Sequence, residues 1–272
     1  MSCRLITLLF FVLLPVAPLT LPATIFAEQY TFGLIPQESA VQMHKRWYPF
    51  VDQLQKETGL EFKIKIFETV AKFEDSFLAG ALDFVYLNST QQVTAWKSQG
   101  YIPLIRSKRF LRGAIFVRND SPFQSLNDLK GMRIAFVSEK SLCDIALGHA
   151  LKTDYNNLNY IPVYVNSASN VYKNVLLKKT SAGGTLDISI NSAEPSVAKQ
   201  LRAIYLTPEM ASHPISAHPR IPIPVQKTLT DGVNTIANSP SGQELLRTVR
   251  LPPPLVSADF ERDYKWLEAY LE

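Results

Sequence analysis

Ser141 stands where a buried strand gives way to a helix, an arrangement that can bind an anionic group. Apart from Arg133, residues 132–137 are β-branched, aromatic or apolar, which is typical of a short buried strand, and apolar residues at helical spacing follow from 145. Ser141 is suited to cap that helix, with Asp144 in the place of a capping-box acid. The first N–H groups of a helix lack intrahelical partners and lie at the positive end of its dipole. The turn of Lys140, Ser141 and Leu142 is therefore a candidate anion site, although an ordinary helix cap explains the same residues.

The same succession of strand and polar turn recurs along the chain. Strand patterns at 30–35, 83–87, 160–165 and 186–190 each run into a turn rich in Ser, Thr, Asn, Gln or Glu. An open α/β sheet gathers such strand ends along one edge, and two lobes with these edges facing would enclose a small polar ligand. The candidate ligand residues at these turns are Gln37, Glu38, Ser89, Thr90, Ser169 and Glu194. Each of them also has a structural interpretation, because such side chains commonly finish turns.

The elements that would position these turns alternate between strand and helix. Apolar residues at 47, 50, 51 and 54 form a helical stripe that ends at Gly59, and strict alternation over 61–66 predicts a half-buried strand. We expect the pair Gly183-Gly184 to break the chain before the strand 186–190, and 201–206 to be extended. This alternation predicts a mixed α/β protein.

The first 27 residues have the features of a secretory signal peptide. A single positive charge, Arg4, precedes an apolar run broken by three prolines, and the small residue Ala27 stands before the charged Glu28. The alternative is an uncleaved membrane anchor. Cleavage would make the mature protein periplasmic.

Composition excludes several classes of function. Loss of 27 residues from 272 leaves 245, with 27 basic against 24 acidic side chains, a balance too mild to indicate nucleic-acid binding. Cys143 would be the one remaining cysteine, which we interpret as a small buried hydrophobe. His44, His149 and His218 lack metal-ligand spacing, and the chain has no catalytic motif, so we expect no metal, no cofactor and no enzyme.

Five phrases run in order over nearly all of the mature chain: GLIPQES, HKRWYPFVDQL, DFVYL, NDSPFQSLNDLKGMRIAFV and HPISAHPRIP. Together they resemble the phosphate, phosphite and phosphonate type of periplasmic solute-binding proteins of ABC transporters. The resemblance implies a two-lobed type II periplasmic-binding-protein fold, each lobe a mixed sheet flanked by helices, with a ligand cleft between the lobes. It implies lobe 1 from 28–117 and 214–272, lobe 2 from 118–213, and chain crossings near 116–119 and 213–216.

The resemblance also bears on the ligand residues. The two family positions for an aromatic hydroxyl correspond to Val70 and Leu87, and the helix start at Ser141 keeps only the first of the family's hydroxyls. Ser169 stands near a family histidine and His213 near a family aspartate, which adds His213 to the candidates; packing at a hinge is the alternative. Glu194 keeps the place of a family glutamate that contacts the amine end of aminophosphonates.

The sequence thus predicts an exported solute-binding protein. It would be a monomer that captures a small polar or anionic ligand, with a phosphate-like or phosphonate-like oxyanion as one class, for an ABC permease. A ligand-sensing module of the same fold that signals to a membrane receptor is the alternative.

Overall fold

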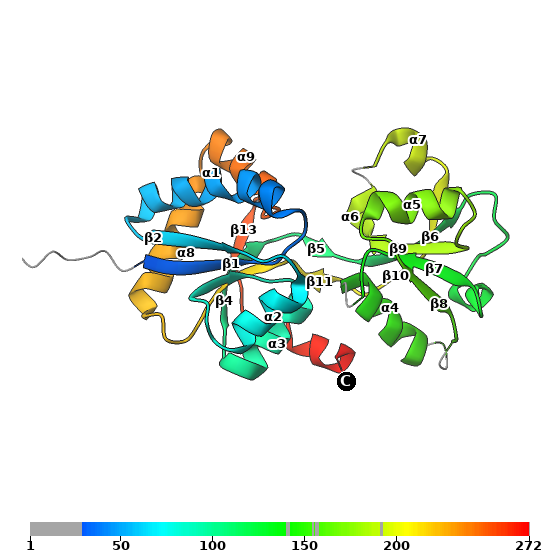
Figure 1. The fold of residues 1–272 in the computed structure, drawn as a ribbon, viewed down its shortest axis with the longest axis horizontal. Coiled ribbons are helices and arrows are strands. Elements are labelled where there is room, and N and C mark those ends of the chain that lie inside the picture. The colour runs from blue at the N-terminus through cyan, green and yellow to red at the C-terminus, as the bar shows by residue number, and fades with distance from the viewer. Residues whose placement is uncertain (1–28, 140–141, 154, 156–157, 191–192, 272) are drawn as a thin grey trace, which may run out of the picture.

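The computed structural model describes residues 29–139, 142–153, 155, 158–190 and 193–271, which form two α/β lobes joined by a narrow two-stranded sheet (Figure 1). Lobe 1 is built on a six-stranded sheet and lobe 2 on a five-stranded sheet. The joining sheet pairs β5 (Phe110–Leu111) with β11 (Met210–Ala211) in antiparallel fashion. The predicted mixed α/β fold class is confirmed.

Lobe 1 contains both ends of the described chain. Its sheet has the order β13 (Leu255–Ser257), β4 (Ile102–Ser107), β12 (Pro214–Ala217), β3 (Phe84–Tyr86), β1 (Gln29–Leu34) and β2 (Glu61–Ile66). The strand β1 runs parallel to β2 and β3, whereas β12 is antiparallel to β3 and β4. One face is covered by α1 (Ala40–Thr58), α8 (Ile223–Ala237) and α9 (Pro240–Thr248), and the other by α2 (Val70–Leu78) and α3 (Ser89–Gln99) (Figure 1). The chain finishes with α10 (Phe260–Asp263) and the 3₁₀ helix η2 (Lys265–Tyr270).

The helical stripe predicted from the sequence builds the core of lobe 1. Trp47, Phe50, Val51 and Leu54 of α1 are all buried in it. The helix ends at Gly59, where φ is 69° and the N–H donates to the carbonyl of Gln55 at 2.8 Å. Glycine suits this position because a left-handed backbone imposes no steric cost on it.

Lobe 2 is the middle of the chain. Its sheet has the order β10 (Leu201–Leu206), β6 (Gly113–Arg118), β9 (Ala182–Leu186), β7 (Arg133–Phe136) and β8 (Ile161–Tyr164). The strand β7 is parallel to β8 and β9, and β6 is antiparallel to β9 and β10. The helices are α4 (Leu142–Thr153), α5 (Ala168–Leu176), the single turns α6 (Asp187–Ile190) and α7 (Pro195–Ala198), and the 3₁₀ helix η1 (Leu126–Leu129).

The predicted strand 186–190 is wrong, because the strand comes earlier and residues 187–190 are the helical turn α6. Gly183 and Gly184 lie inside β9 rather than breaking the chain before it. A Cβ at Gly183 would lie 2.4 Å from Cγ1 of Val171, and one at Gly184 would lie 2.4 Å from Cε1 of Phe136. The two glycines therefore let helix α5 and the Phe136 ring pack directly on the backbone of the strand.

The first crossing between the lobes also differs from the expected one. Residues 113–117, assigned from the sequence to lobe 1, belong to β6, which lies between β10 and β9 in the lobe 2 sheet. The chain leaves lobe 1 after β4, passes through β5 and enters lobe 2 at Gly113; it returns from β10 through β11 to β12. The extended run 113–118 is visible in the sequence, but its pattern does not say which sheet it joins.

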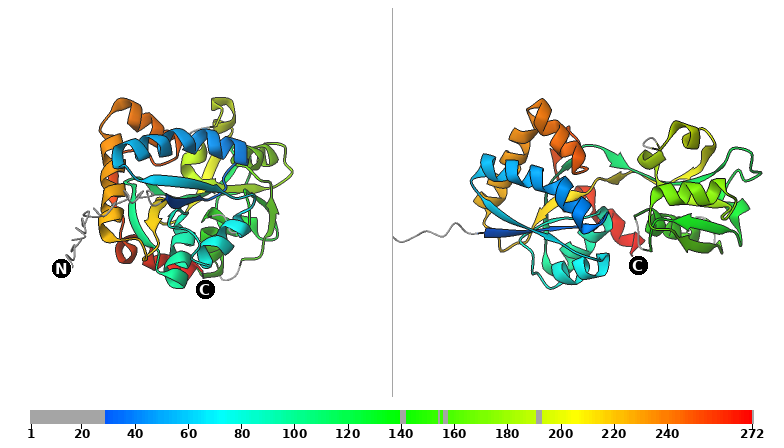
Figure 2. Two further views of the ribbon diagram at one scale, coloured as in Figure 1. Left: turned by 60° about the vertical axis from the view of Figure 1, so that its left-hand side comes forward. Right: turned by 45° about the horizontal axis from the view of Figure 1, so that its top comes forward.

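The C-terminal segment lies beside the crossings and packs against lobe 2. One apolar cluster contains Phe260, Tyr264 and Leu267 of this segment together with Leu142 and Ala146 of α4. The ring of Tyr270 also stacks on that of His149 in α4, with centroids 4.0 Å apart. The right-hand view in Figure 2 shows this red segment running from lobe 1 toward lobe 2, and it contacts α4, so it forms a further contact between the lobes.

A buried ion pair fixes the C-terminal segment to the lobe 1 sheet. Asp263 accepts hydrogen bonds from Arg106 Nη2 at 2.9 Å and from Arg262 Nε at 2.8 Å, and the Arg106 and Asp263 side chains are only 6% and 4% exposed. Burial alone would raise the pKa of the Asp263 carboxyl, but hydrogen bonds from Arg262 and Arg106 outweigh it and hold the pKa well below its usual range.

We predict that Asp263→Asn destabilises the protein by about 3–5 kcal/mol, because it leaves the Arg106 guanidinium buried without its countercharge. Since the folded-state pKa is depressed, the carboxylate contributes its stability above the unfolded pKa of about 3.9 and loses it as the pH falls below that value. Urea unfolding at pH 7 and pH 3 measures both effects. Asp231→Asn, which removes an exposed ion pair with Lys227, is the control and should change stability little. An Asp263→Asn variant as stable as the control would contradict the prediction.

Candidate functional site

The carboxyl ends of the strands of both lobes lie at the crossings. In lobe 1, β3 ends at Tyr86 and the hydroxyl of Ser89, three residues on, donates to the Ala211 carbonyl of β11 at 2.5 Å. In lobe 2, β9 ends at Leu186 and the N–H of Asp187 donates to the carbonyl of Arg112, next to β5, at 2.9 Å. Ligands of open α/β sheets generally bind outside such strand ends, and the fold brings the strand ends of two sheets to one place.

Two arginines share one carboxylate at the lobe 1 edge. Glu38 follows β1, and its Oε1 accepts from Arg46 Nη2 of α1 at 2.6 Å and from Arg250 Nη2 at 3.0 Å. The Glu38 side chain is 26% exposed, so this cluster faces solvent in part. Two cations against one carboxylate leave the edge with a net positive charge, which favours an anionic ligand. The arginines were not among the sequence candidates, because nothing in their spacing relates them to Glu38.

His213 lies in contact with the same cluster through Tyr86. The two rings meet edge to face with centroids 5.6 Å apart, and the buried Tyr86 hydroxyl donates to the carbonyl of Arg250 at 3.1 Å. Burial, with a smaller effect of the Arg250 charge, lowers the pKa of His213 to about 4. His213 is therefore neutral at pH 7. The structure thus brings Glu38 and His213, 175 positions apart in the sequence, to one edge.

The start of α3 is buried and closely hydrogen-bonded. Asn88 caps it in a capping box with Gln91, and its Oδ1 accepts from the Thr90 hydroxyl at 2.9 Å. Ser89 and Thr90 are 0% and 3% exposed. Both hydroxyls serve the fold, which fits the structural interpretation left open for them, and a ligand role for Ser89 and Thr90 stays a prediction.

The lobe 2 side of the edge is the start of α4. Lys140 and Ser141 lie outside the described residues, and Leu142, the first residue of α4, is buried in the cluster that also contains Val93 of α3 and Ala211 of β11. Cys143 is buried as expected, and burial raises the pKa of its thiol to about 12, so it is not a nucleophile at neutral pH.

The remaining three candidates, Gln37, Ser169 and Glu194, are more exposed than Ser89 and Thr90. Gln37 is half-buried next to Glu38, whereas Ser169 in the first turn of α5 and Glu194 before α7 are exposed. The cap of α5 is Ser167, whose side chain accepts from the N–H of Asn170. The Glu194 side chain does not cap α7. Contact of these three residues with a ligand remains a prediction.

Two general features of the described residues bear on function. Within 29–271, apart from the gaps given above, no group of three or more His, Cys, Asp or Glu side chains is arranged to hold a metal ion. No helix in that same part of the chain is long and apolar enough to cross a membrane.

Comparison with known proteins gives a family and a fold. The family model for the periplasmic substrate-binding protein of phosphonate ABC transporters matches residues 32–264. No curated protein matches closely enough to count as a relative. The fold is similar to that of PhnD1 from Prochlorococcus marinus in complex with methylphosphonate, with 18% identity over 89% of this chain and 96% of that one and a TM-score of 0.75.

Two further solved structures are similar. XAC2383 from Xanthomonas citri, bound to chloride ion, has 17% identity over 89% of this chain and 97% of that one and a TM-score of 0.75. A binding protein component of an ABC phosphonate transporter from Pseudomonas aeruginosa has 14% identity over 85% of this chain and 82% of that one and a TM-score of 0.69. At these identities the likeness shows the fold.

The environment of His213 generates a pH prediction. Because its folded pKa of about 4 lies below the unfolded value of about 6.5, protonation favours the unfolded chain, and stability falls as the pH drops between these values. We expect His213 to contribute a slope of up to about 1.4 kcal/mol per pH unit in this window. Urea unfolding of His213→Gln from pH 7 to pH 4 should lack this part of the slope. His44→Gln on the exposed face of α1 is the control; equal slopes for the two variants would refute the assignment.

Proposed function

This chain belongs to the family of periplasmic substrate-binding proteins of phosphonate ABC transporters, and we propose that it captures a small oxyanion of the phosphate or phosphonate class between its lobes. The family consists of substrate-binding components that work with membrane permeases, not of enzymes. The sequence-based recognition of the family is thereby confirmed. Our proposal concerns the class of ligand and the residues that bind it.

The observation that carries the proposal is the meeting of two strand-end edges at the crossings. Ser89 and Asp187, which follow strands of different lobes, both hydrogen-bond to the crossing segments. The chain passes between the lobes in these segments, so we propose that rotation about them opens and closes the space between the edges.

The electrostatics of the edges favour an anion with several acceptor oxygens. Arg46 and Arg250 leave lobe 1 positive, and the start of α4 in lobe 2 supplies helix N–H groups. The neutral His213 adds no charge at pH 7 but can donate or accept a hydrogen bond. We propose that the ligand is bound by Gln37, Glu38, Lys140, Ser141, the N–H of Leu142, Ser169, Glu194 and His213. Ser89 and Thr90 would support this site through their hydrogen bonds within the fold.

We further propose that the mature protein is a periplasmic monomer produced by cleavage before Glu28. The mass of the exported protein should correspond to a chain that begins near Glu28, because Ala27 is the small residue best placed before the charged start. An intact N-terminus in the membrane fraction would show an anchor instead.

The ligand class is tested by a thermal-shift panel of phosphate, phosphite, methylphosphonate, methylsulfonate and acetate. A ligand at a hundred times its dissociation constant adds about 2.7 kcal/mol to the free energy of unfolding, so a true ligand gives a clear shift. We expect the phosphorus oxyanions to stabilise the protein most. If the protein binds such an anion tightly but no permease encoded beside its gene takes up that anion, the sensing function is favoured.

Variants of Ser141 test the lobe 2 part of the site. Ser141→Ala should weaken binding of the best anion by about 0.5–1.5 kcal/mol, the value of one hydrogen bond. Ser141→Asp keeps a good N-cap but puts a negative charge where the anion must lie, so binding should be lost while the melting temperature without ligand is unchanged.

Calorimetry with the two variants separates the two interpretations of Ser141. If Ser141→Asp binds as tightly as the parent, Ser141 is only a helix cap and the anion binds elsewhere. Ser239→Asp, at the N-cap of α9 in lobe 1, controls for the general effect of a new charge at a helix cap.

A further inference from the structure

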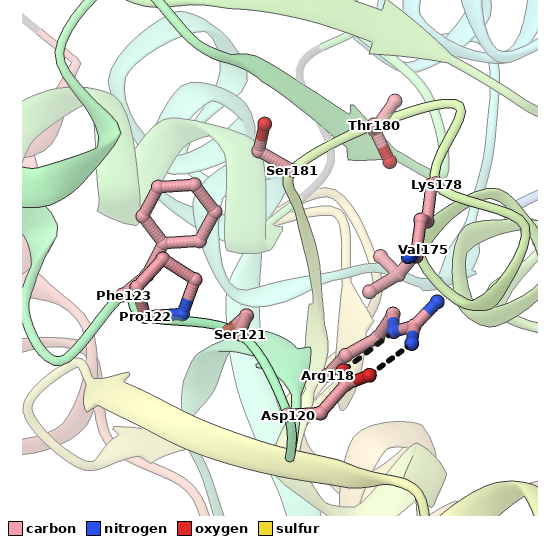
Figure 3. Close-up of a pocket in the computed structure, with 9 residues that line it drawn as sticks. All are labelled: Arg118, Asp120, Ser121, Pro122, Phe123, Val175, Lys178, Thr180 and Ser181. Atoms are coloured by element: carbon pink, nitrogen blue, oxygen red, sulfur yellow. Dashed lines mark hydrogen bonds and ion pairs between the residues drawn. The ribbon is translucent and has the colours of Figure 1, made fainter.

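We propose that lobe 2 has a second small-molecule site, which binds a small carboxylate with a short apolar body. A pocket of about 290 Å³ lies between the loop 118–123 after β6 and the turn 178–181 between α5 and β9 (Figure 3). Small-molecule pockets are about 300–1,000 Å³, so this one suits a ligand of few atoms.

Two buried hydroxyl groups without partners line this pocket. Among the described residues, Ser121 Oγ and Thr180 Oγ1 are the buried side-chain oxygens or nitrogens with no hydrogen-bond partner. Thr180 is 4% exposed, and in Figure 3 its hydroxyl oxygen points toward Val175 and Arg118 across the pocket. Buried polar groups in folded proteins are generally satisfied, so the coincidence of both in one pocket indicates a bound polar group that each can contact.

The charges around the pocket favour an anion. Arg118 donates through Nε to Asp120 at 2.8 Å and through Nη1 to the Leu176 carbonyl at 3.1 Å, while the Asp120 side chain is 66% exposed at the rim. Lys178 adds a second cation to the lining. Two cations against one exposed carboxylate leave a net positive charge beside two hydroxyl donors, which is suitable for a carboxylate group.

The opposite wall is apolar and firmly held. Pro122 and Phe123 form this wall, and Val175 lies across the pocket beside Thr180, so an apolar ligand body has a surface to contact (Figure 3). Arg202 fixes this loop, because its Nη2 donates to the carbonyls of Ser121 at 3.1 Å and Phe123 at 2.5 Å. The pocket is therefore formed before any ligand binds, and ordering it costs a ligand little.

The pocket is separate from the edge described above. The strand β6 starts at Gly113, next to the crossing, and ends at Arg118, so its length of five residue steps, roughly 17 Å, separates the two places. The antiparallel register of β9 agrees, because Leu186 pairs with Gly113 at the crossing end and Gly183 pairs with Phe116 toward the other.

The test uses 3-methylbutanoate, a carboxylate with a short apolar body, and the mature chain with and without methylphosphonate. We expect saturable binding by calorimetry, unaffected by methylphosphonate, and amide shifts in two-dimensional NMR confined to residues around 118–123 and 174–182. Thr180→Val keeps the side-chain shape but removes the hydroxyl, and it should weaken binding about three- to tenfold. Lys178→Asn, an exchange that the φ of 57° at this position tolerates, should weaken it at least as much.

Two controls make the test decisive. Thr228→Val, on the exposed face of α8, should bind as the parent does. Without ligand, Thr180→Val should melt no lower than the parent because its hydroxyl has no protein partner, whereas Thr207→Val should melt lower because Thr207 accepts from the N–H of Gly113 at 2.8 Å.

Three results would overturn the proposal. They are absence of saturable binding at millimolar 3-methylbutanoate, unchanged affinity in Thr180→Val, and amide shifts at the crossings rather than around the pocket. A melting temperature of Thr180→Val as low as that of Thr207→Val would also count against it, because water would then already satisfy the hydroxyl.

Discussion

The structure depends on the apolar cluster that joins α4 of lobe 2 to α3, β11 and the C-terminal segment. Leu142 and Ala146 of α4 lie in this cluster with Val93 of α3 and Tyr264 of the C-terminal segment. The cluster holds the start of α4 beside the crossings, which is where the proposed anion site requires its N–H groups. The buried pair of Arg106 and Asp263 anchors the C-terminal segment to the lobe 1 sheet. The ion pair therefore holds the residues that this segment contributes to the cluster in place against lobe 1.

Charge at the lobe 1 edge follows from the same arrangement. Arg250 lies between α9 and β13 with a φ of 63°, and its side chain reaches the Glu38 carboxylate that Arg46 also contacts. Its carbonyl accepts the Tyr86 hydroxyl, so one residue joins the ion cluster to the Tyr86 and His213 rings. Both arginines of this edge are paired with Glu38, so the edge carries a net positive charge and neither arginine lacks a partner.

Much of the fold could be predicted from the sequence because the signals are local. The stripe of Trp47 and Leu54, the cap at Gly59 and the extended run 201–206 depend on neighbours within a few residues. The strand β9 could not be predicted, since Gly183 and Gly184 usually break strands and are retained here only because Val171 and Phe136, distant in the sequence, pack on them. The first crossing was missed for a similar reason, because pairing of β5 with β11 is a contact across about a hundred residues.

The candidate site was predictable in part. Glu38 and His213 were predicted from their place at turns and from the family resemblance. The structure brings them to one edge, and their contact with a ligand stays a prediction. The arginines near them have no periodic pattern in the sequence. Ser89 and Thr90 were predicted by the same reasoning, yet their hydroxyls make hydrogen bonds within the fold. A polar residue at a strand end can support the site or contact the ligand, and composition does not distinguish the two.

Closure of the lobes on an anion is the central claim, and a distance between the lobes tests it most directly. Spin labels at Val41→Cys in α1 and Lys173→Cys in α5, both exposed, can be placed in a Cys143→Ala background that removes the one other cysteine of the mature chain. We expect pulsed electron paramagnetic resonance to show a shorter distance between the labels when the tightest-binding phosphorus oxyanion is saturating, and the same long distance with chloride alone. Identical distance distributions with and without a saturating anion would contradict capture between the lobes.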